Sequence, residues 1–305
     1  MKSAALKSDV LLLLTAAIWG FAFVAQRLGM DHVGPFTFNG VRFALGSLSL
    51  LPLWLLSRRR INRAPVVSPA ASTKLLLWGG VVAGMALFTG ASLQQVGLVY
   101  TTAGKAGFIT GLYVILVPIL GLLWRQRPHA GTWGGATLAV FGLYLLCVTE
   151  EFTIAFGDLL ELLGALFWAG HVLLIGWLSP RVDAIRLSCI QFAVCSLLSL
   201  AVAVALEVIS LHGLLSAALP ILYGGLMSVG VAYTLQVVAQ REAHPAHTAI
   251  ILSLEGAFAA LGGWLILGET LSARGLLGCL LMLAGMLFSE LSGFFVRRRQ
   301  VAGAA

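Results

Sequence analysis

Ten apolar runs alternate with short polar connections along this chain. Each run is close to the ~20 residues that an α-helix needs to cross the hydrocarbon core of a bilayer. The longest polar connection, Ser57 to Thr73, is too short to form a soluble domain. The pattern therefore predicts an all-α integral membrane protein with ten transmembrane helices, at 9–27, 36–57, 74–93, 101–124, 131–149, 158–178, 184–208, 214–237, 246–267 and 273–296.

The two halves of the chain resemble each other. Asp9 and Trp19 of the first run recur as Asp158 and Trp168 of the sixth run, 149 positions later. The same offset relates the second run to the seventh, matching Phe43, Ala44, Ser47 and Leu48 with Phe192, Ala193, Ser196 and Leu197. We therefore expect two five-helix repeats, residues 1–149 and 150–305, an arrangement that is typical of secondary transporters.

Basic residues are unevenly distributed between the two sides of the predicted membrane. Of the 19 Lys and Arg residues, 15 fall in connections on one side, and only Arg27 and Arg274 fall in connections on the other. The positive-inside rule then places both termini in the cytoplasm. Because five helices per repeat is an odd number, the second repeat must be inverted. The charges agree, since the connection after the second run carries five basic residues and its equivalent after the seventh run carries none.

The composition also indicates a membrane protein. Hydrophobic residues make up 59% of the chain and charged residues 10%, where a soluble domain carries about 25% charged residues. The apolar surface of the helices must therefore face lipid, and we expect a multi-pass protein of the inner (plasma) membrane. The basic residues form short clusters between the apolar runs, so no nucleic-acid partner is expected. All four cysteines lie in apolar runs without a CxxC pair, so neither a disulfide framework nor a metal site is expected.

Charged side chains inside the predicted spans are the first candidates for function, because a charge near the bilayer centre costs at least about 2.5–3.5 kcal/mol. Glu255 lies nine positions into its run, about 13 Å deep. Its equivalent in the first repeat, 142 positions earlier, is Tyr113. Together the two could recognise an ammonium group, or Glu255 could carry a coupling proton. The alternative is a structural carboxyl group that is hydrogen-bonded to Ser253 or to neighbouring helices.

Arg42 and Lys105 lie nearer the outer ends of their runs, and either could attract a substrate carboxylate at the outer mouth. In the alternative interpretation both are structural. Lys105 would extend its ammonium group to the outer headgroups, and Arg42, whose equivalent is Gln191, would tie loops together. His171, just past the middle of its run, could bind substrate or protons, or could only satisfy a buried hydrogen bond.

Trp19 and Trp168 occupy equivalent mid-run positions, away from the interfaces where tryptophan usually anchors a span. Facing inward, they would line the cavity and suit apolar or cationic substrates through stacking and cation–π contacts. Facing lipid, they would only fill space. Polar residues near the ends of two equivalent runs are expected at a gate or vestibule: Gln94, Gln95, Gln236 and Gln240.

Several motifs, in their order and spacing, resemble the EamA-type ten-helix transporters of the drug/metabolite transporter superfamily. They are Ala16–Gly20 (AAIWG), Pro35 followed by Arg42-Phe43, Tyr100–Ala106 (YTTAGKA), Leu254-Glu255 and Leu267–Leu271 (LGETL). The first half departs from the family pattern at 125–128 (RQRP), where LGE is usual. The resemblance covers nearly the whole chain. It implies two repeats around a central cavity, alternating access and, usually, export of amino acids or related metabolites, with cationic drugs as further substrates.

We therefore expect a secondary carrier for small amphipathic metabolites that is not an enzyme and needs no cofactor. The chain has no GxxxxGK[ST] motif for ATP, and no GxSxG or HExxH motif of a hydrolase. The alternatives are an intramembrane enzyme built on His171 and Glu255, and a passive channel, which would not exchange substrates as a carrier does. The choice between proton coupling and facilitated flux stays open at this point, as does the choice between a monomer and a homodimer.

Overall fold

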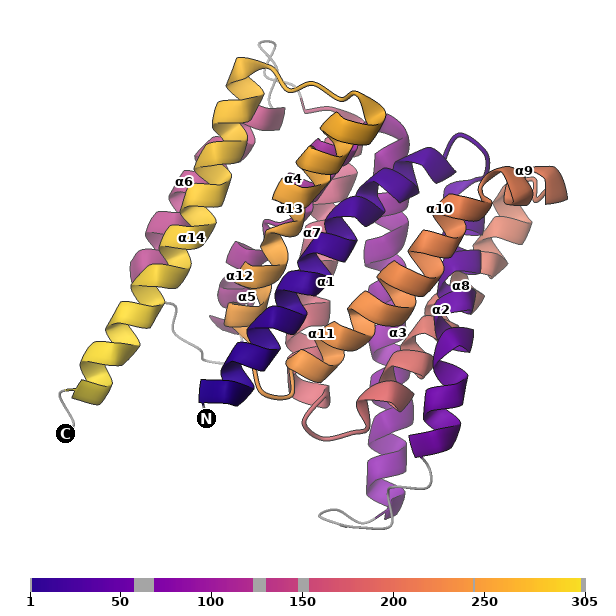
Figure 1. Cartoon of the computed structure of the whole chain (residues 1–305), viewed down its shortest axis with the longest axis horizontal. Coiled ribbons are helices and arrows are strands. Elements are labelled where there is room, and N and C mark those ends of the chain that lie inside the picture. Colours follow the sequence, from indigo (N-terminus) through magenta and orange to yellow (C-terminus); the bar gives the residue numbers. More distant parts are fainter. Residues whose placement is uncertain (1, 58–68, 123–129, 148–153, 244, 303–305) are drawn as a thin grey trace.

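The structure, a computed structural model, describes residues 2–57, 69–122, 130–147, 154–243 and 245–302, and within these ranges it is a bundle of helices with no β-strand (Figure 1). The described helices are α1 (Lys2–Gly29), α2 (Pro35–Ser57), α3 (Pro69–Tyr100), α4 (Ala103–Thr110), α5 (Tyr113–Gly121), α6 (Ala130–Cys147), α7 (Phe156–Leu178), α8 (Ala184–Leu206), α9 (Leu211–Ser216), α10 (Ala218–Leu222), α11 (Thr234–Ala239), α12 (Pro245–Ser253), α13 (Glu255–Gly262) and α14 (Ala273–Ala302). Two further segments, Tyr223–Tyr233 and Gly263–Leu267, are π-helical.

In the part of the chain that the structure describes, seven helical stretches are long and apolar enough to cross a membrane: Leu6–Gly29, Thr73–Tyr100, Ala103–Gly121, Phe156–Leu178, Ala184–Leu206, Ala218–Ala239 and His247–Leu267. The other three predicted spans correspond to α2, α6 and α14, and the described apolar parts of α6 and α14 are shorter. Large apolar side chains such as Trp78 and Val204 are more than 70% exposed, as lipid-facing residues should be. The all-α membrane class is confirmed, and ten spans in two inverted repeats stay a prediction.

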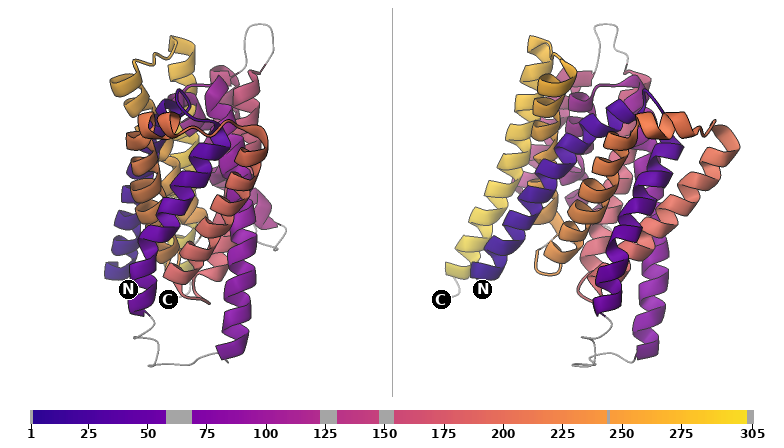
Figure 2. Two further views of the ribbon diagram at one scale, coloured as in Figure 1. Left: turned by 90° about the vertical axis from the view of Figure 1, so that its right-hand side faces the viewer. Right: turned by 45° about the vertical axis from the view of Figure 1, so that its right-hand side comes forward.

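Helices from the two predicted repeats interleave. The main contacts pair α2 with α8, α3 with both α7 and α8, α4 with α13, and α6 with α14. The last two helices lie side by side at one edge of the bundle (Figures 1 and 2). The approach of α6 to α14 requires glycine. A Cβ atom on Gly142 would lie 2.5 Å from the carbonyl oxygen of Gly278, and one on Gly285 would lie 2.5 Å from that of Gly135.

Two hydrogen bonds between α2 and α8 are related by the 149-residue offset of the sequence repeat. The hydroxyl of Ser47 donates to the carbonyl oxygen of Cys189 at 3.0 Å, and the hydroxyl of Ser196 donates to that of Gly40 at 2.8 Å. Adding 149 to positions 47 and 40 gives 196 and 189. The contact therefore maps onto itself when the two helices are exchanged, as it does across a two-fold axis.

Two of the spans are interrupted at equivalent positions. One breaks between α4 and α5, and the other breaks at Leu254, between α12 and α13. At each break the backbone closes a tighter i→i−3 hydrogen bond, from Leu112 to Ile109 at 3.1 Å and from Leu254 to Ile251 at 3.3 Å. These two bonds are 142 positions apart, the offset that relates Tyr113 to Glu255. Interrupted helices of transporters commonly line the substrate site.

Candidate functional site

A small cavity of about 30 Å³ lies inside the bundle, and both helix breaks border it. Most of the residues singled out from the sequence line it: Trp19, Arg42, Gln94, Tyr113, Trp168, His171, Gln236 and Glu255. The other lining residues are Ala22, Phe23, Gln26, Thr110, Val172, Ser228, Tyr233 and Leu252. Lys105, Gln95 and Gln240 do not line the cavity.

The carboxyl group of Glu255 is the acidic group of this cavity. Glu255 is the first residue of α13, directly after the helix break, and is only 3% exposed. Tyr113, from the equivalent break, lines the same cavity, and neither its hydroxyl nor Oε1 of Glu255 has a hydrogen-bond partner among the described residues. Ser253 is not the partner of Glu255, since the Ser253 hydroxyl donates to the carbonyl oxygen of Ile250 at 2.7 Å. Within the described ranges no basic side chain lies at ion-pair distance from Glu255.

The basic group of the cavity is Arg42. We predicted it near the outer mouth, but its side chain is 2% exposed and lines the cavity. Its Nε donates to Oδ1 of Asn39 at 2.9 Å, and its guanidinium carbon lies 4.9 Å from the ring centroid of Phe43. Its Nη2 has no hydrogen-bond partner, and no carboxylate lies at ion-pair distance in the part of the chain that the structure describes. Because a buried cation without a counter-ion is costly, Arg42 is suited to binding an anionic group of a ligand.

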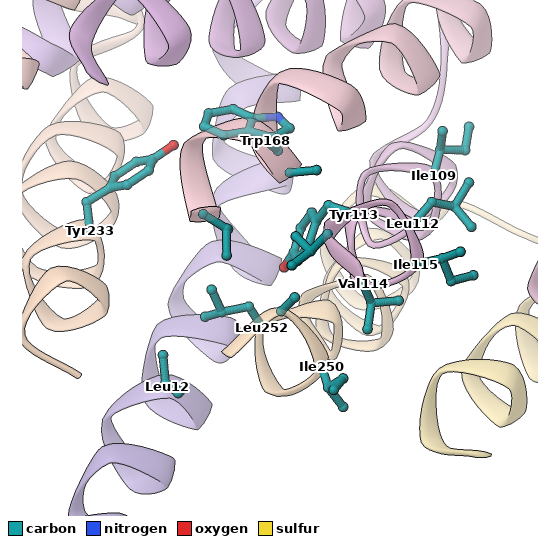
Figure 3. Close-up of a cluster of buried hydrophobic side chains, with 14 of the residues drawn as sticks. Leu12, Ile109, Leu112, Tyr113, Val114, Ile115, Trp168, Tyr233, Ile250 and Leu252 are labelled. Atoms are coloured by element: carbon teal, nitrogen blue, oxygen red, sulfur yellow. The ribbon is translucent and has the colours of Figure 1, made fainter. Parts of the chain in front are cut away.

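Aromatic side chains form one wall of the cavity, with Tyr233 at their centre. The ring centroid of Tyr233 lies 4.5 Å from that of Trp19 and 6.2 Å from that of Trp168. Figure 3 shows Tyr113, Trp168 and Tyr233 projecting from three different helices toward a common interior space. The Trp19 indole N–H donates to the carbonyl oxygen of Ser228 at 3.2 Å, which fixes its ring. Both tryptophans therefore face the cavity, where they can stack on an apolar or cationic ligand.

His171 lines the cavity and also has a structural partner. Its Nε2 lies 2.9 Å from Oε1 of Gln191, and its ring packs edge-on against those of Trp168 and Tyr233. Gln191 is the residue of the second repeat that is equivalent to Arg42. The alternative interpretation of His171 expected a buried hydrogen bond, and that bond is present. A role of His171 in substrate binding stays a prediction.

The four glutamines fall into two groups. Gln94 and Gln236 line the cavity. Gln95 instead donates from Nε2 to the carbonyl oxygen of Gln26 at 3.3 Å, and Gln240 donates to that of Val172 at 3.0 Å. The second group therefore ties neighbouring helices together, since each of its members binds the backbone of another span.

Lys105 lies away from the cavity, at the end of the bundle opposite the start of α1. We call this the distal end; α9 lies there, at the top of Figure 1. The Lys105 Nζ is 2.5 Å from Oδ2 of Asp158, and the hydroxyl of Thr101 donates to Oδ1 of the same carboxylate at 2.5 Å. The Asp158 side chain is 1% exposed and that of Lys105 is 23% exposed. Lys105 thus pairs with a buried carboxylate, and attraction of a substrate to it stays a prediction.

Two more carboxylates join the halves at the distal end. Glu207, just after α8, accepts the backbone N–H groups of Phe36 at 2.8 Å and Thr37 at 2.7 Å, at the start of α2. Glu269, of the LGETL motif, accepts the backbone N–H groups at the start of α4, from Ala103 at 2.8 Å and Gly104 at 3.0 Å. Each carboxylate satisfies helix N-terminal donors that no helical carbonyl can reach. We refer to these two contacts and the Lys105–Asp158 pair as the distal contacts.

Two functional candidates were missed from the sequence. Tyr233 was overlooked, although its equivalent at the 145-residue offset that relates Gly79 and Gly80 to Gly224 and Gly225 is the aromatic Phe88. Glu161 was overlooked because it lies only three residues into its predicted span, where a carboxyl group would reach the headgroups. The structure begins α7 at Phe156 and buries Glu161 completely.

Taken together, the cavity presents a carboxyl group, a guanidinium without a counter-ion and an aromatic wall. These groups are chemically complementary to a small molecule that carries an ammonium group, a carboxylate and an apolar part. Among the described residues no cluster of three His, Cys, Asp or Glu side chains could hold a metal ion.

Comparison with known proteins identifies relatives over the whole length of the chain. The model of the EamA-like transporter family matches twice, at residues 6–148 and 155–291. An uncharacterized transporter of Archaeoglobus fulgidus is 32% identical over 290 residues, which cover 94% of this chain and 86% of that protein. A probable amino-acid metabolite efflux pump of Escherichia coli K12 is 26% identical over 167 residues, which cover 53% of this chain and 51% of the pump.

A solved structure shares the fold. It is a crystal structure described only as that of a protein, and it superposes with a TM-score of 0.68 at 17% sequence identity. The match covers 95% of this chain and 98% of the other. At this identity the likeness concerns the fold alone.

Proposed function

Since this chain belongs to the EamA-like transporter family and is a membrane transporter, we propose that it is a secondary carrier that exports amino acids or closely related amphipathic metabolites. The carrier works by alternating access, in which one central site opens to each side of the membrane in turn. The observation that carries the proposal is the cavity in which Glu255, Arg42 and the aromatic wall around Tyr233 meet.

Each part of an α-amino acid has a complementary group in this cavity. The ammonium group suits the Glu255 carboxyl and the Tyr113 hydroxyl, and the carboxylate suits Arg42. An aromatic or aliphatic side chain packs against Trp19, Trp168 and Tyr233, and a cationic drug would use the same wall. A relative of this chain is named a probable amino-acid metabolite efflux pump, which supports this choice of substrate.

Local symmetry supports alternating access. The Ser47 and Ser196 hydrogen bonds exchange under the 149-residue offset, and the helix breaks recur at the 142-residue offset. The two matches to one family model divide the chain near the expected boundary between 1–149 and 150–305. Two similar halves of opposite orientation provide a carrier with two similar gates. Because the connections rich in basic residues face the cytoplasm, both termini lie in the cytoplasm and the distal end faces outward.

Counterflow tests the proposal. Proteoliposomes containing the purified protein are preloaded with an unlabelled amino-acid panel and then given labelled aromatic and aliphatic amino acids one at a time. Saturable, transient accumulation of label is expected for a carrier, because exchange drives uptake. A passive channel would only equilibrate the label. Absence of accumulation for every amino acid would overturn the proposed substrate class, and sugars, nucleosides and cationic drugs would be tested next.

A further inference from the structure

Glu161 of α7 is a second acidic residue buried in the bundle. It is 0% exposed and does not line the substrate cavity. Its Oε2 accepts a hydrogen bond from the Thr110 hydroxyl at 3.2 Å, and its Oε1 has no partner among the described residues. A carboxyl group in this position needs an explanation, because an ionised carboxylate without a counter-ion is expensive inside a membrane protein.

The surroundings of Glu161 leave room for a proton on its carboxyl group but not for a larger ligand. α7 packs here against α3, α4 and α5. From α3, a Cβ atom on Gly97 would lie 2.8 Å from Oε1 of Glu161, so there is no room for a larger ligand. The charged groups that act on it electrostatically are Asp158, one turn earlier in α7, and Glu255 of α13. Lys105 of α4 pairs with Asp158, and no basic side chain of the described ranges lies at ion-pair distance from Glu161.

Glu161 connects the distal end to the cavity. On one side, Asp158 shares its helix face and reaches Lys105, whose side chain is partly exposed. On the other side, Thr110 lines the cavity and accepts a hydrogen bond from Nε2 of Gln94 at 3.3 Å. Carboxyl and hydroxyl groups thus follow one another from the distal surface to the substrate site, through a bundle whose packing is otherwise mainly apolar.

We propose that Glu161 is the binding site for a proton that is exchanged for substrate. The proton reaches Glu161 from the distal surface by way of Asp158 and leaves it toward the cavity by way of Thr110 when the cavity is open to the cytoplasm. The proposal rests on the proposed carrier function and adds its energy source. An ammonium group bound beside Glu255 brings positive charge toward Glu161 and favours loss of the proton. Because binding effects are reciprocal, a proton on Glu161 disfavours the ammonium group, which is the relation that an antiporter needs.

The test compares two forms of transport in the same proteoliposomes. A gradient of one pH unit, acid inside, should drive accumulation of substrate up to about tenfold in the wild type, since one pH unit corresponds to a factor of ten for one exchanged proton. Glu161→Gln should abolish this accumulation but retain counterflow, which needs no gradient. Glu161→Asp, which keeps the carboxyl group, should retain both.

A second measurement needs no gradient. Addition of substrate to purified wild-type protein in weakly buffered solution should release up to one proton per protein, read with a pH indicator, and Glu161→Gln should release none. A wild type that shows counterflow but neither gradient-driven accumulation nor proton release would overturn the proton site and leave the carrier function standing. Glu161→Gln protein that still couples transport to the gradient would also overturn the proposal. Absence of counterflow in the wild type would overturn the carrier function instead.

Discussion

Ser47 and Ser196 make the same hydrogen bond in opposite directions. Each hydroxyl donates across the α2–α8 contact to a carbonyl oxygen of the other helix, at 3.0 Å for Ser47 and 2.8 Å for Ser196. A pair of bonds that exchange under a sequence offset indicates that the two halves are related by symmetry at this contact and not only in sequence.

Replacement of either serine by alanine should therefore have the same effect. We expect Ser47→Ala and Ser196→Ala each to lower the free energy of unfolding by about 0.6 kcal/mol, the average for hydrogen bonds between membrane helices. Thermal unfolding in detergent measures both. Ser49→Ala is the control, because the Ser49 hydroxyl bonds within its own helix, to Gly46 at 2.8 Å. Clearly unequal losses for Ser47 and Ser196 would contradict the two-fold relation.

Glu255→Gln should raise the substrate concentration for half-maximal counterflow by about 10- to 100-fold. The reason is loss of a charged hydrogen bond to the substrate ammonium group, worth about 1.5–3 kcal/mol. The matched control is Glu242→Gln, the same change at an exposed position outside the cavity. If the half-maximal substrate concentration is the same in Glu255→Gln protein and in the wild type, Glu255 does not bind the substrate.

Arg42→Gln should change substrate choice more than stability of the fold. With Arg42 present, an amino acid should bind more tightly than its decarboxylated amine. We expect the ratio of the two affinities to fall by about 10- to 100-fold when the charged hydrogen bond to the carboxylate is lost. Competition of phenylalanine and phenethylamine in counterflow measures this ratio. Arg181→Gln is the control, since Arg181 is exposed and packs on Trp177. An equal ratio in wild type and Arg42→Gln would show that Arg42 does not bind the carboxylate.

Lys105→Met should lower stability without changing the half-saturating substrate concentration. Removing one partner of a buried ion pair costs about 3–5 kcal/mol, and we expect less here because the Lys105 side chain is 23% exposed. The double variant Lys105→Met/Asp158→Leu should recover part of the loss, since no buried charge is then left unpaired. Thermal unfolding and counterflow are measured on all three proteins. Weaker substrate binding with unchanged stability would instead indicate that Lys105 contacts the substrate.

Gly34→Ala should weaken the distal end. A Cβ atom at Gly34 would overlap with the carboxylate of Glu207 and displace it from the N–H groups of Phe36 and Thr37. Loss of such a helix cap costs about 1 kcal/mol, which thermal unfolding detects. Gly170→Ala is the control, because a Cβ atom there meets nothing within 4 Å and alanine favours the helix. Similar effects of both substitutions would exclude the Glu207 contact as a stabilising feature.

Many residues that line the cavity could be predicted because polar and aromatic residues are easily recognised among the apolar residues of a membrane span. A polar or aromatic residue in mid-span is costly or unusual, so Trp19, Trp168 and Glu255 could be identified one by one. The repeat offset added Tyr113, which carries no such signal by itself. Arg42 was placed too far out, because distance along a helix does not show that Asn39 and Phe43 hold the guanidinium inside the bundle.

Other features depend on contacts that no local pattern contains. Lys105 and Asp158 are 53 positions apart and lie in different predicted repeats, so the sequence offered only the lone lysine near a span end. The helix breaks at Leu112 and Leu254 have no proline at the break itself, and they became visible only through their backbone hydrogen bonds. Glu161 needed the true start of α7 before its burial could be recognised.

The distal contacts divide their chemical roles unequally between the two halves. In each, the carboxylate comes from residues 150–305, as Asp158, Glu207 or Glu269, and the donor comes from residues 1–149. The Lys105–Asp158 pair has an equivalent near the start of α1, because the 142- and 149-residue offsets relate it to His247 and Asp9, whose Nε2 and Oδ1 atoms lie 2.8 Å apart. In this second pair the carboxylate comes from residues 1–149 and its partner from residues 150–305, so the roles of the halves are exchanged. If the chain arose by gene duplication, an ancestral dimer of identical, oppositely oriented subunits had an acceptor facing a donor in both of these pairs.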